Sequence, residues 1–206
     1  MIKSIIKLRE IATTNDYWAK SLQRKIFKTN DMYAEIHGSD IDRDWKTMFY
    51  HNYARPRACF ITWLVFWGRL PTKDRLAKIQ IITDGICNFC GEQENLTHLF
   101  FQCRYTAHIW QRILIWIGYQ RNSGDWTQEK LWLSLESKKK GWRRVLLRMT
   151  ATETIYHLWQ ARNALCFEQI TPSPDIVHQI QSAVVLRAQS IKCLKNHVHL
   201  VSLEIR

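Results

Sequence analysis

The sequence has few of the residues that interrupt a chain: its 206 residues include 7 glycines and 4 prolines, and no internal repeat or low-complexity tract is visible. Two stretches are predicted as loops. Residues 118–127 mix Gly, Asn, Ser and Asp after an apolar run, and in 171–175 proline disfavours helix in the residue before it. Segments that alternate apolar and polar residues are also scarce. We therefore predict a mainly α-helical fold with little sheet.

Long apolar stretches are missing as well. The longest, 59–67, is interrupted by Thr62 and falls short of the roughly 20 residues that span a bilayer. Near the first residue, Arg9 and Glu10 stand where a signal peptide needs a continuous apolar region. We therefore expect a soluble, non-secreted protein that is intracellular and has no membrane partner.

The sequence also lacks the motifs of common catalytic sites. It has no Tyr/Phe-x-Asp-Asp segment, so two-metal nucleotide transfer by a polymerase has no carboxylate platform, and it has no endonuclease motif. A Gly-rich phosphate loop, a G-x-S-x-G elbow and a G-x-G-x-x-G fingerprint are absent too. We therefore predict no catalytic residues and no enzyme activity.

Acidic residues are too few to balance the basic ones. Lys and Arg total 30 against 18 Asp and Glu, which gives a formal net charge of +12. Residues 1–80 carry +7, residues 81–120 carry −1 and residues 121–206 carry +6. A strongly basic globular chain favours a polyanionic partner, and nucleic acid comes first among these. We expect that partner to contact the two basic flanks rather than the nearly neutral middle.

Helical periodicity and capping residues indicate where the helices lie. Thr72 is a predicted N-cap, Thr150 has Glu153 in the capping-box position, and Ser173 is a predicted N-cap before Pro174. Most of the ten tryptophans are expected in the core, since burial is the commoner fate of this side chain. Spacing of i, i+3, i+4 and i+7 predicts one buried helical stripe, made of Phe60, Trp63, Leu64 and Trp67.

The neutral middle contains the clearest chemical signal. Cys87 and Cys90 form a C-x2-C knuckle followed by Gly91, and His98 and Cys103 complete the spacing C-x2-C-x7-H-x4-C. Glycine tolerates the backbone angles that such a turn demands. In an intracellular protein, closely spaced cysteines indicate metal ligands before disulfides.

Three thiolates and one imidazole suit tetrahedral Zn²⁺, and four protein ligands leave no position for a reactive water. We therefore predict one structural zinc ion on this set. The alternative is a group of ordinary core cysteines with a buried histidine.

The second ligand pair sets a condition on the backbone. His98 and Cys103 are five residues apart, which rotates one from the other by about 140° on a continuous α-helix. We therefore predict a short helix that carries His98 and ends just before Cys103, with the chain turning at Arg104 and Tyr105.

The residues around this cluster resemble a known family. Residues 55–110 are similar to the zinc-binding domain of plant LINE-type reverse transcriptases, in which this domain follows the polymerase. The matching features are a Trp-rich helix, the block GRLPTKDRL at 68–76, the four ligands with HLFF at 98–101, and Trp110. The resemblance implies a zinc-binding module that is a C-terminal piece of such an element, without its polymerase.

Weaker similarity extends on both sides. Residues 158–167, LWQARNALCF, resemble the family's downstream W-x-x-R-N-x-x-x-F segment, and the helix at 176–195 resembles its terminal helix. Residues 27–33 are a poor version of the segment that leads in. We therefore predict three parts: a helical lead-in segment 1–50, a reverse transcriptase-type zinc-binding domain 51–118 and a basic helical region 119–206.

Two clusters of basic side chains are the candidate nucleic-acid contacts. One cluster lies in 69–75 and the other in 138–148. In the cluster at 138–148, Arg144 and Arg148 are one helical turn apart, so both can face phosphates. Trp142, beside Arg143, is the one candidate among the tryptophans for stacking on a base, and the alternative is that it packs in the core as most tryptophans do. The alternative is that this cluster is a solvated helix start. The predicted contacts are Arg69, Lys73, Arg75, Lys138, Lys139, Lys140, Arg143, Arg144 and Arg148.

The charge and the resemblance together imply non-catalytic binding of RNA, DNA or both, in the nucleus rather than the cytoplasm, and association with a reverse transcriptase. Binding through phosphates should be weakly sequence-selective and salt-sensitive. Two alternatives stay open: a structural or protein-interaction zinc module, and a decayed element fragment without selected function. A contiguous positive face would favour nucleic acid, whereas a large exposed aliphatic patch would favour a protein partner.

Overall fold

A computed structural model describes residues 44–81 and 84–197 of the chain. In these ranges the fold is helical, and the one β feature is an isolated antiparallel bridge between Ile86 and Gln93, which confirms the mainly α prediction. None of the helices described is long and apolar enough to cross a membrane. The elements are η1 (Asp44–Met48), α4 (Pro56–Phe66), α5 (Lys73–Lys78), η2 (His98–Gln102), α6 (Arg104–Trp116), α7 (Trp126–Lys138), α8 (Trp142–Asn163), η3 (Ala164–Glu168) and α9 (Ile176–Ala188).

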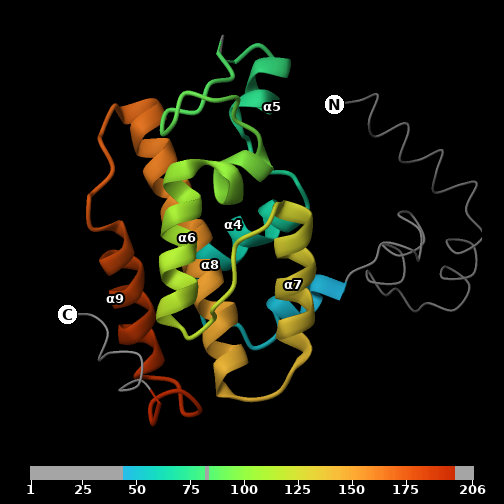
Figure 1. The fold of residues 1–206 in the computed structure, drawn as a ribbon, viewed down its shortest axis with the longest axis vertical. Helices are drawn as coiled ribbons and strands as arrows, with labels where there is room; N and C mark the ends of the chain where they lie inside the picture. The colour runs from blue at the N-terminus through green and yellow to red at the C-terminus, as the bar shows by residue number, and fades with distance from the viewer. Residues whose placement is uncertain (1–43, 82–83, 198–206) are drawn as a thin grey trace, which may run out of the picture. The chain divides into compact units, whose positions relative to one another are not determined.

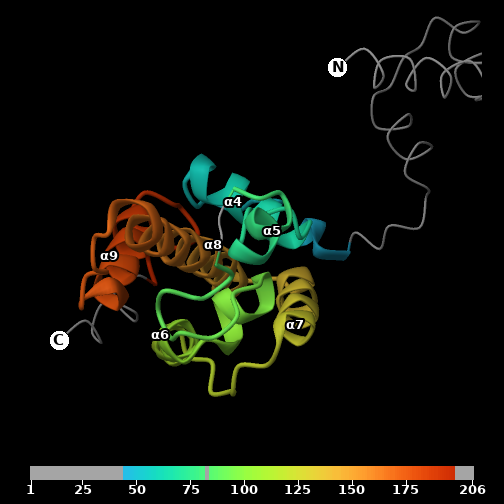
Figure 2. The same cartoon turned by 90° about the horizontal axis from the view of Figure 1, so that it is seen from above.

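The long helix α8 is the centre of the fold (Figures 1 and 2). It contacts α4, α6, α7 and α9, and every residue from 146 to 156 is buried. A helix that is buried on all sides needs neighbours around its whole circumference, and these four helices supply them. The predicted division into 1–50, 51–118 and 119–206 stays a prediction; residues of the second and third parts share one hydrophobic core.

Aromatic rings supply much of that core. Of the tryptophans in the described ranges, Trp45, Trp110, Trp116 and Trp159 are buried, and the others are half-buried and pack against the core. Edge-to-face pairs join distant segments: the ring of Phe66 in α4 lies 5.1 Å from that of Trp126 at the start of α7. The expectation that most tryptophans belong to the core is confirmed.

The face that α4 turns inward differs from the predicted one. Its buried side chains are Ala58, Thr62, Val65 and Phe66, whereas Phe60 is 57% exposed. Phe60 stacks on the half-buried Trp63 instead, with ring centroids 6.1 Å apart. The spacing predicted the helix correctly and the stripe wrongly, because an all-round apolar helix does not reveal its inner face by periodicity.

One of the three predicted helix starts is confirmed. Thr72 is the N-cap of α5, but α8 begins at Trp142, so Thr150 lies in the interior of a helix rather than at its start. There its carbonyl accepts a hydrogen bond from the Thr154 hydroxyl at 2.8 Å. Ser173 is also not an N-cap, since α9 begins two residues later than predicted, at Ile176.

Candidate metal centre

The four predicted ligands come together around the knuckle. The ligand atoms of Cys87, Cys90, His98 and Cys103 all lie within 4.8 Å of one another, and Cys90 Sγ lies 3.1 Å from His98 Nε2. Tetrahedral zinc with Zn–S bonds of about 2.3 Å places its ligand atoms roughly 3.8 Å apart. Cys87, His98 and Cys103 are buried and Cys90 is half-buried. The cluster is compatible with one zinc ion.

The knuckle is a tight hairpin that closes around the first two cysteines. The Cys87 N–H donates to the Glu92 carbonyl at 2.7 Å, and the Gly91 N–H donates to the Cys87 carbonyl at 2.9 Å. Outside these bonds, the Glu94 N–H donates to the carbonyl of Gly85 at 2.7 Å. Gly91 has φ +83°, a conformation that side chains with a Cβ rarely adopt. In the C-x2-C-G sequence the cysteines therefore supply ligand atoms, and the glycine allows the backbone conformation that the turn requires.

The second ligand pair is brought together by a π-helical turn. In η2 the Cys103 N–H donates to the His98 carbonyl at 2.7 Å, which is the i→i+5 bond of a π-helix. This wider turn returns residue i+5 to the side of residue i, which an α-helix does not. The prediction that the helix ends just before Cys103 is confirmed. The predicted turn at Arg104 and Tyr105 is wrong. The two helices are separated by Cys103 alone, whose backbone is extended, and α6 begins at Arg104.

Two polar side chains contact His98, one at the imidazole and one at the backbone. Glu92 Oε2 lies 3.5 Å from His98 Nδ1, so the Nε2 atom is the one turned toward the three sulfurs. Asn95 Oδ1 accepts from the His98 N–H at 2.9 Å and starts the turn that carries this ligand. Carboxylates beside the second nitrogen of a histidine commonly fix its tautomer at metal sites.

The Cys87 thiol and, to a smaller extent, the start of α6 favour negative charge on the Cys103 sulfur. Hydrogen bonds to Cys103, from the Cys87 thiol first and also from the backbone N–H groups of Thr106 and Tyr105, lower the pKa of Cys103 to about 5. The same thiol–thiolate bond, together with burial, raises the pKa of Cys87. These bonds favour the thiolate form of Cys103, and a bound cation would displace the protons of the other two thiols.

A buried ion pair fastens the knuckle to the helical core. Arg162 in α8 donates from Nη2 to Glu94 Oε1 at 2.6 Å and from Nε to both carboxylate oxygens, and both side chains are about 1% exposed. Glu94 Oε1 also accepts from the Lys73 N–H at 2.8 Å. A bidentate pair of this kind is strong and geometrically specific. One carboxylate thus joins the knuckle, α5 and α8.

This link also explains the W-x-x-R-N-x-x-x-F segment. The Arg162 guanidinium lies 5.0 Å from the Trp159 ring and 5.5 Å from the Phe167 ring, and Asn163 Oδ1 accepts from its Nη1 at 3.0 Å. The conspicuous residues of the segment therefore surround one arginine. Glu94 and Arg162 were missed as site residues; the signal that could have found Arg162 was its place in that motif.

Two of the predicted phosphate contacts are buried, so the structure corrects them. Lys73 is 5% exposed and its Nζ pairs with Asp84 at 2.8 Å, which holds the pKa of that carboxyl below its usual range. Arg148 is 8% exposed, and its Nη1 donates to the Ser137 carbonyl at 3.0 Å. Burial lowers the pKa of Arg148. Both cations hold segments of the fold together rather than facing solvent.

The remaining predicted contacts lie in three places. Arg69 and Arg75 are exposed near the α4–α5 connection, where Arg75 donates to the Gly68 carbonyl. Arg144 is half-buried and pairs with Glu136 at 2.6 Å. The exposed cations at the α7–α8 connection are Lys138, Lys139, Lys140 and Arg143.

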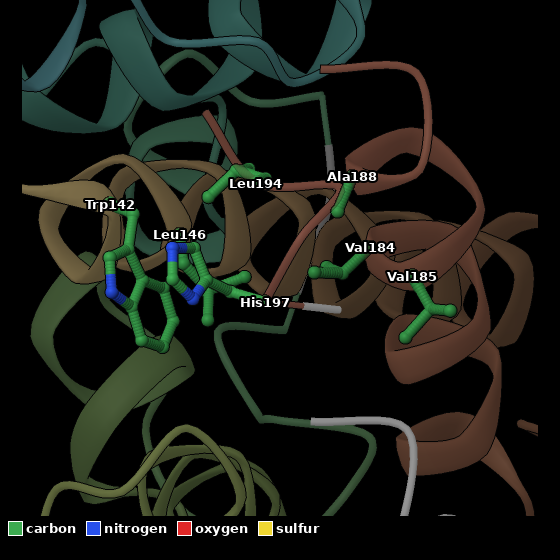
Figure 3. A pocket seen from close by; sticks show the side chains of 7 residues that line it. All are labelled: Trp142, Leu146, Val184, Val185, Ala188, Leu194 and His197. Carbon is green, nitrogen blue, oxygen red and sulfur yellow. The ribbon is translucent and has the colours of Figure 1, made fainter. Parts of the chain in front are cut away.

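Trp142, the candidate for base stacking, already has a stacking partner. The ring of Trp142 lies 4.3 Å from that of His197 at an interplanar angle of 6° (Figure 3). Leu146 and Leu194 border the same small apolar pocket, which holds about 10 Å³. This pocket has room for about one water molecule and no base. Trp142 therefore packs the first turn of α8 against the residues that follow α9.

The comparisons with known proteins point to one family. No curated protein and no solved structure matches the chain. A family model matches residues 27–110, about two fifths of the chain, and this range contains all four candidate ligands. It also contains residues 27–33, which lie outside the described residues. The matched family is a zinc-binding accessory domain rather than the catalytic polymerase domain. In residues 27–110 the chain is similar to the family described as zinc-binding in reverse transcriptase.

Proposed function

We propose that this protein is a non-catalytic nucleic-acid-binding module that is stabilised by one structural zinc ion and derives from a plant LINE-type reverse transcriptase. The Cys3His cluster, which lies inside the residues matched by the zinc-binding family, carries the proposal. Cys87, Cys90, His98 and Cys103 would hold the ion. Zinc held this way replaces the apolar core that a short loop cannot supply.

The charge of the chain supports a polyanionic partner. The formal net charge is +12, and the α7–α8 connection exposes Lys139, Lys140 and Arg143 on neighbouring positions. Phosphate contacts carry little sequence information, so binding is expected to be weakly selective and to weaken steeply with salt. Retroelement ancestry would place the protein in the nucleus and in association with a reverse transcriptase.

A salt titration on a zinc-quantified sample tests the proposal. Fluorescently labelled 20-nucleotide RNA, single-stranded DNA and duplex DNA are titrated with the full chain at several KCl concentrations. We expect a linear fall of log affinity with log salt, with a slope of about −3 or steeper for a four-phosphate contact on single strands. No binding at low salt, or a flat response, would refute nucleic-acid binding.

One observation favours a second candidate, a protein-interaction module. Leu131 and Leu135 lie one turn apart on α7 and are 58% and 50% exposed. Exposed aliphatic pairs on a helix are common contacts for a partner helix. The variant Leu131→Gln/Leu135→Gln separates the two functions: a protein-interaction role predicts loss of self-association or of polymerase capture, whereas nucleic-acid affinity should not change.

A further inference from the structure

Helix α6 presents a row of basic side chains beside the candidate metal centre. Arg104, His108 and Arg112 are spaced four residues apart and all three are exposed. Residues four apart lie on one face of an α-helix, so the three side chains project to the same side. The opposite face of α6 is apolar and buried through Ile109, Ile113 and neighbouring residues.

These three side chains differ from Arg144 and Arg162 in having no acidic partner. No ion pair is found for Arg104, His108 or Arg112 among the residues that the structure describes, and Arg104 makes one long hydrogen bond, to the Cys90 carbonyl at 3.4 Å. By contrast, Arg121 is paired with the buried Glu129 at 2.7 Å, and Arg162 is paired with Glu94. The α6 row therefore retains positive charge that the fold does not use.

The row borders a cleft between α6, the knuckle and the start of α9. This cleft measures about 400 Å³, within the size range of ligand sites. The segment that begins α9 supplies an apolar wall, and α6 packs beside α9 in both views (Figures 1 and 2). The lining residues are Phe89, Arg104, Tyr105, His108, Ile109, Arg112, Pro174, Ile176 and Val177.

Two aromatic rings stand at the knuckle end of the cleft. Phe89 and Tyr105 are stacked with centroids 4.8 Å apart at 23°, and both are half-buried, so each retains accessible ring surface. Phe89 lies between Cys87 and Cys90, and Tyr105 is two residues after Cys103. Both rings are thus carried by residues next to the candidate metal ligands. Cations in a row beside accessible rings are what single-stranded polynucleotides bind, through phosphates and unpaired bases.

We infer that this cleft binds a single-stranded polynucleotide, with Arg104 and Arg112 on phosphates and the Phe89–Tyr105 pair beside a base. This inference rests on the proposed nucleic-acid-binding function and places the main contact on the α6 cleft instead of the two basic flanks. The sequence predicted contacts on the two basic flanks, because residues 81–120 sum to −1. The charge sum of residues 81–120 does not reveal the row on α6. Two of the acidic residues in this range, Asp84 and Glu94, are paired with Lys73 and Arg162, so they do not neutralise the row.

The test compares two charge-matched variants of the full, zinc-loaded chain. Arg104→Gln/Arg112→Gln removes two charges from the cleft, and Lys192→Gln/Lys195→Gln removes two exposed charges from the segment that follows α9. The probes are fluorescent oligothymidylate and oligouridylate of 20 nucleotides. We expect the cleft variant to lose about tenfold in affinity and about 1.4 in the magnitude of the salt slope, the value for two phosphates on single strands, with less than a twofold loss for the control.

The possible outcomes separate the inference from the proposed function. If the unmodified chain shows no salt-dependent binding, the proposed function fails. If it binds and the cleft variant keeps its affinity and slope, or if both variants lose equally, the inference is overturned while the proposed function stands. Zinc content and thermal midpoint check the fold, and Arg112→Gln alone, far from the ligands, should still lower the slope by about 0.7.

Probe chemistry tests the role of the rings. An oligonucleotide of abasic sites has the same phosphates as oligothymidylate, so binding about tenfold weaker than that of oligothymidylate is expected if one base stacks. Equal affinity would overturn the base contact, and preference for a 20-base-pair duplex would overturn the single-strand assignment. The uridylate and thymidylate arms decide whether RNA or DNA is the tighter ligand.

Discussion

The knuckle and helix α8 are held in place by different forces. In residues 84–97 the two buried side chains are Cys87 and Glu94, neither of them a hydrocarbon, whereas residues 146–156 of α8 are buried without interruption. Apolar burial stabilises α8 at roughly 25 cal/mol per Å². The knuckle has less apolar burial, since Phe89 and Leu96 are only half-buried against the core, and it depends more on the metal cluster and one ion pair. Its order should therefore respond to cation supply and to single polar substitutions that α8 would tolerate.

Removal of the metal should have the largest effect. Cys87→Ser or excess chelator removes a binding free energy that is about 10–16 kcal/mol for structural zinc in small fingers, part of which appears here as stability. We expect a lower and broader thermal transition, and loss of amide protection first in 85–103. Cys59→Ser, a half-buried cysteine of α4 outside the cluster, is the control. An unchanged transition after complete chelation would contradict the structural role of the metal.

Breaking the ion pair between the two regions should come next. Glu94→Gln leaves Arg162 buried without its counter-charge, which typically costs about 3–5 kcal/mol of the free energy of unfolding. Glu129→Gln provides a matched control, because Glu129 is equally buried and pairs with Arg121 away from the knuckle. Urea unfolding and zinc competition are measured on both variants. Both should lose stability, but Glu94→Gln alone should weaken zinc binding; equal zinc affinities would show that the knuckle does not need this link.

A smaller effect is expected at the turn of the knuckle. Gly91→Ala forces a side chain into φ +83° and should cost about 1 kcal/mol, read as weaker zinc binding, whereas no atom within 4 Å obstructs the added Cβ. Gly91→Asn should cost less, since asparagine tolerates left-handed backbone better. A competition titration with a chromogenic chelator ranks the three proteins. The ranking glycine, asparagine, alanine is expected, and alanine equal to glycine would mean that the turn relaxes.

The smallest effect concerns pH in the helical region. Burial, and then the Arg55 guanidinium, lower the pKa of His157 below its ordinary value. The unfolded chain therefore binds this proton first, so stability is present above about pH 6.5 and is lost as pH falls toward the lowered pKa. The His157→Gln variant should lose less stability than the unmodified chain between pH 7 and 5, both zinc-loaded, by urea unfolding. Parallel pH profiles would assign the loss to other groups.

The sequence predicted the local features well. The spacing of Cys87, Cys90, His98 and Cys103 predicted which side chains meet, and the rotation between the last two predicted a helix break, because both depend on neighbours within a few turns. A local motif marks Arg162, but the link between Glu94 and Arg162 spans 68 residues and no local pattern pairs the two. It could not be predicted, since only the packing of α8 brings the two together.

Surface charge was the least predictable feature. Lys73 and Arg148 belong to runs of basic residues, which usually lie in solvent, yet each is buried against a specific acceptor. Conversely, the basic residues of the row on α6 are separated in the sequence by apolar residues of the buried face, so they do not form a recognisable basic cluster. Charge counting along a chain averages over all faces of a helix, and only the fold shows which face is free.

Zinc stoichiometry tests the central claim most directly. Purified full-length chain is dialysed against metal-free buffer, and zinc and sulfur are quantified together by plasma mass spectrometry. We predict about one zinc ion per chain, lost in Cys87→Ser and in His98→Ala and retained in Cys59→Ser. A metal-free, fully folded chain, or zinc retained at full stoichiometry in the Cys87 variant, would contradict the claim that this cluster is the metal centre.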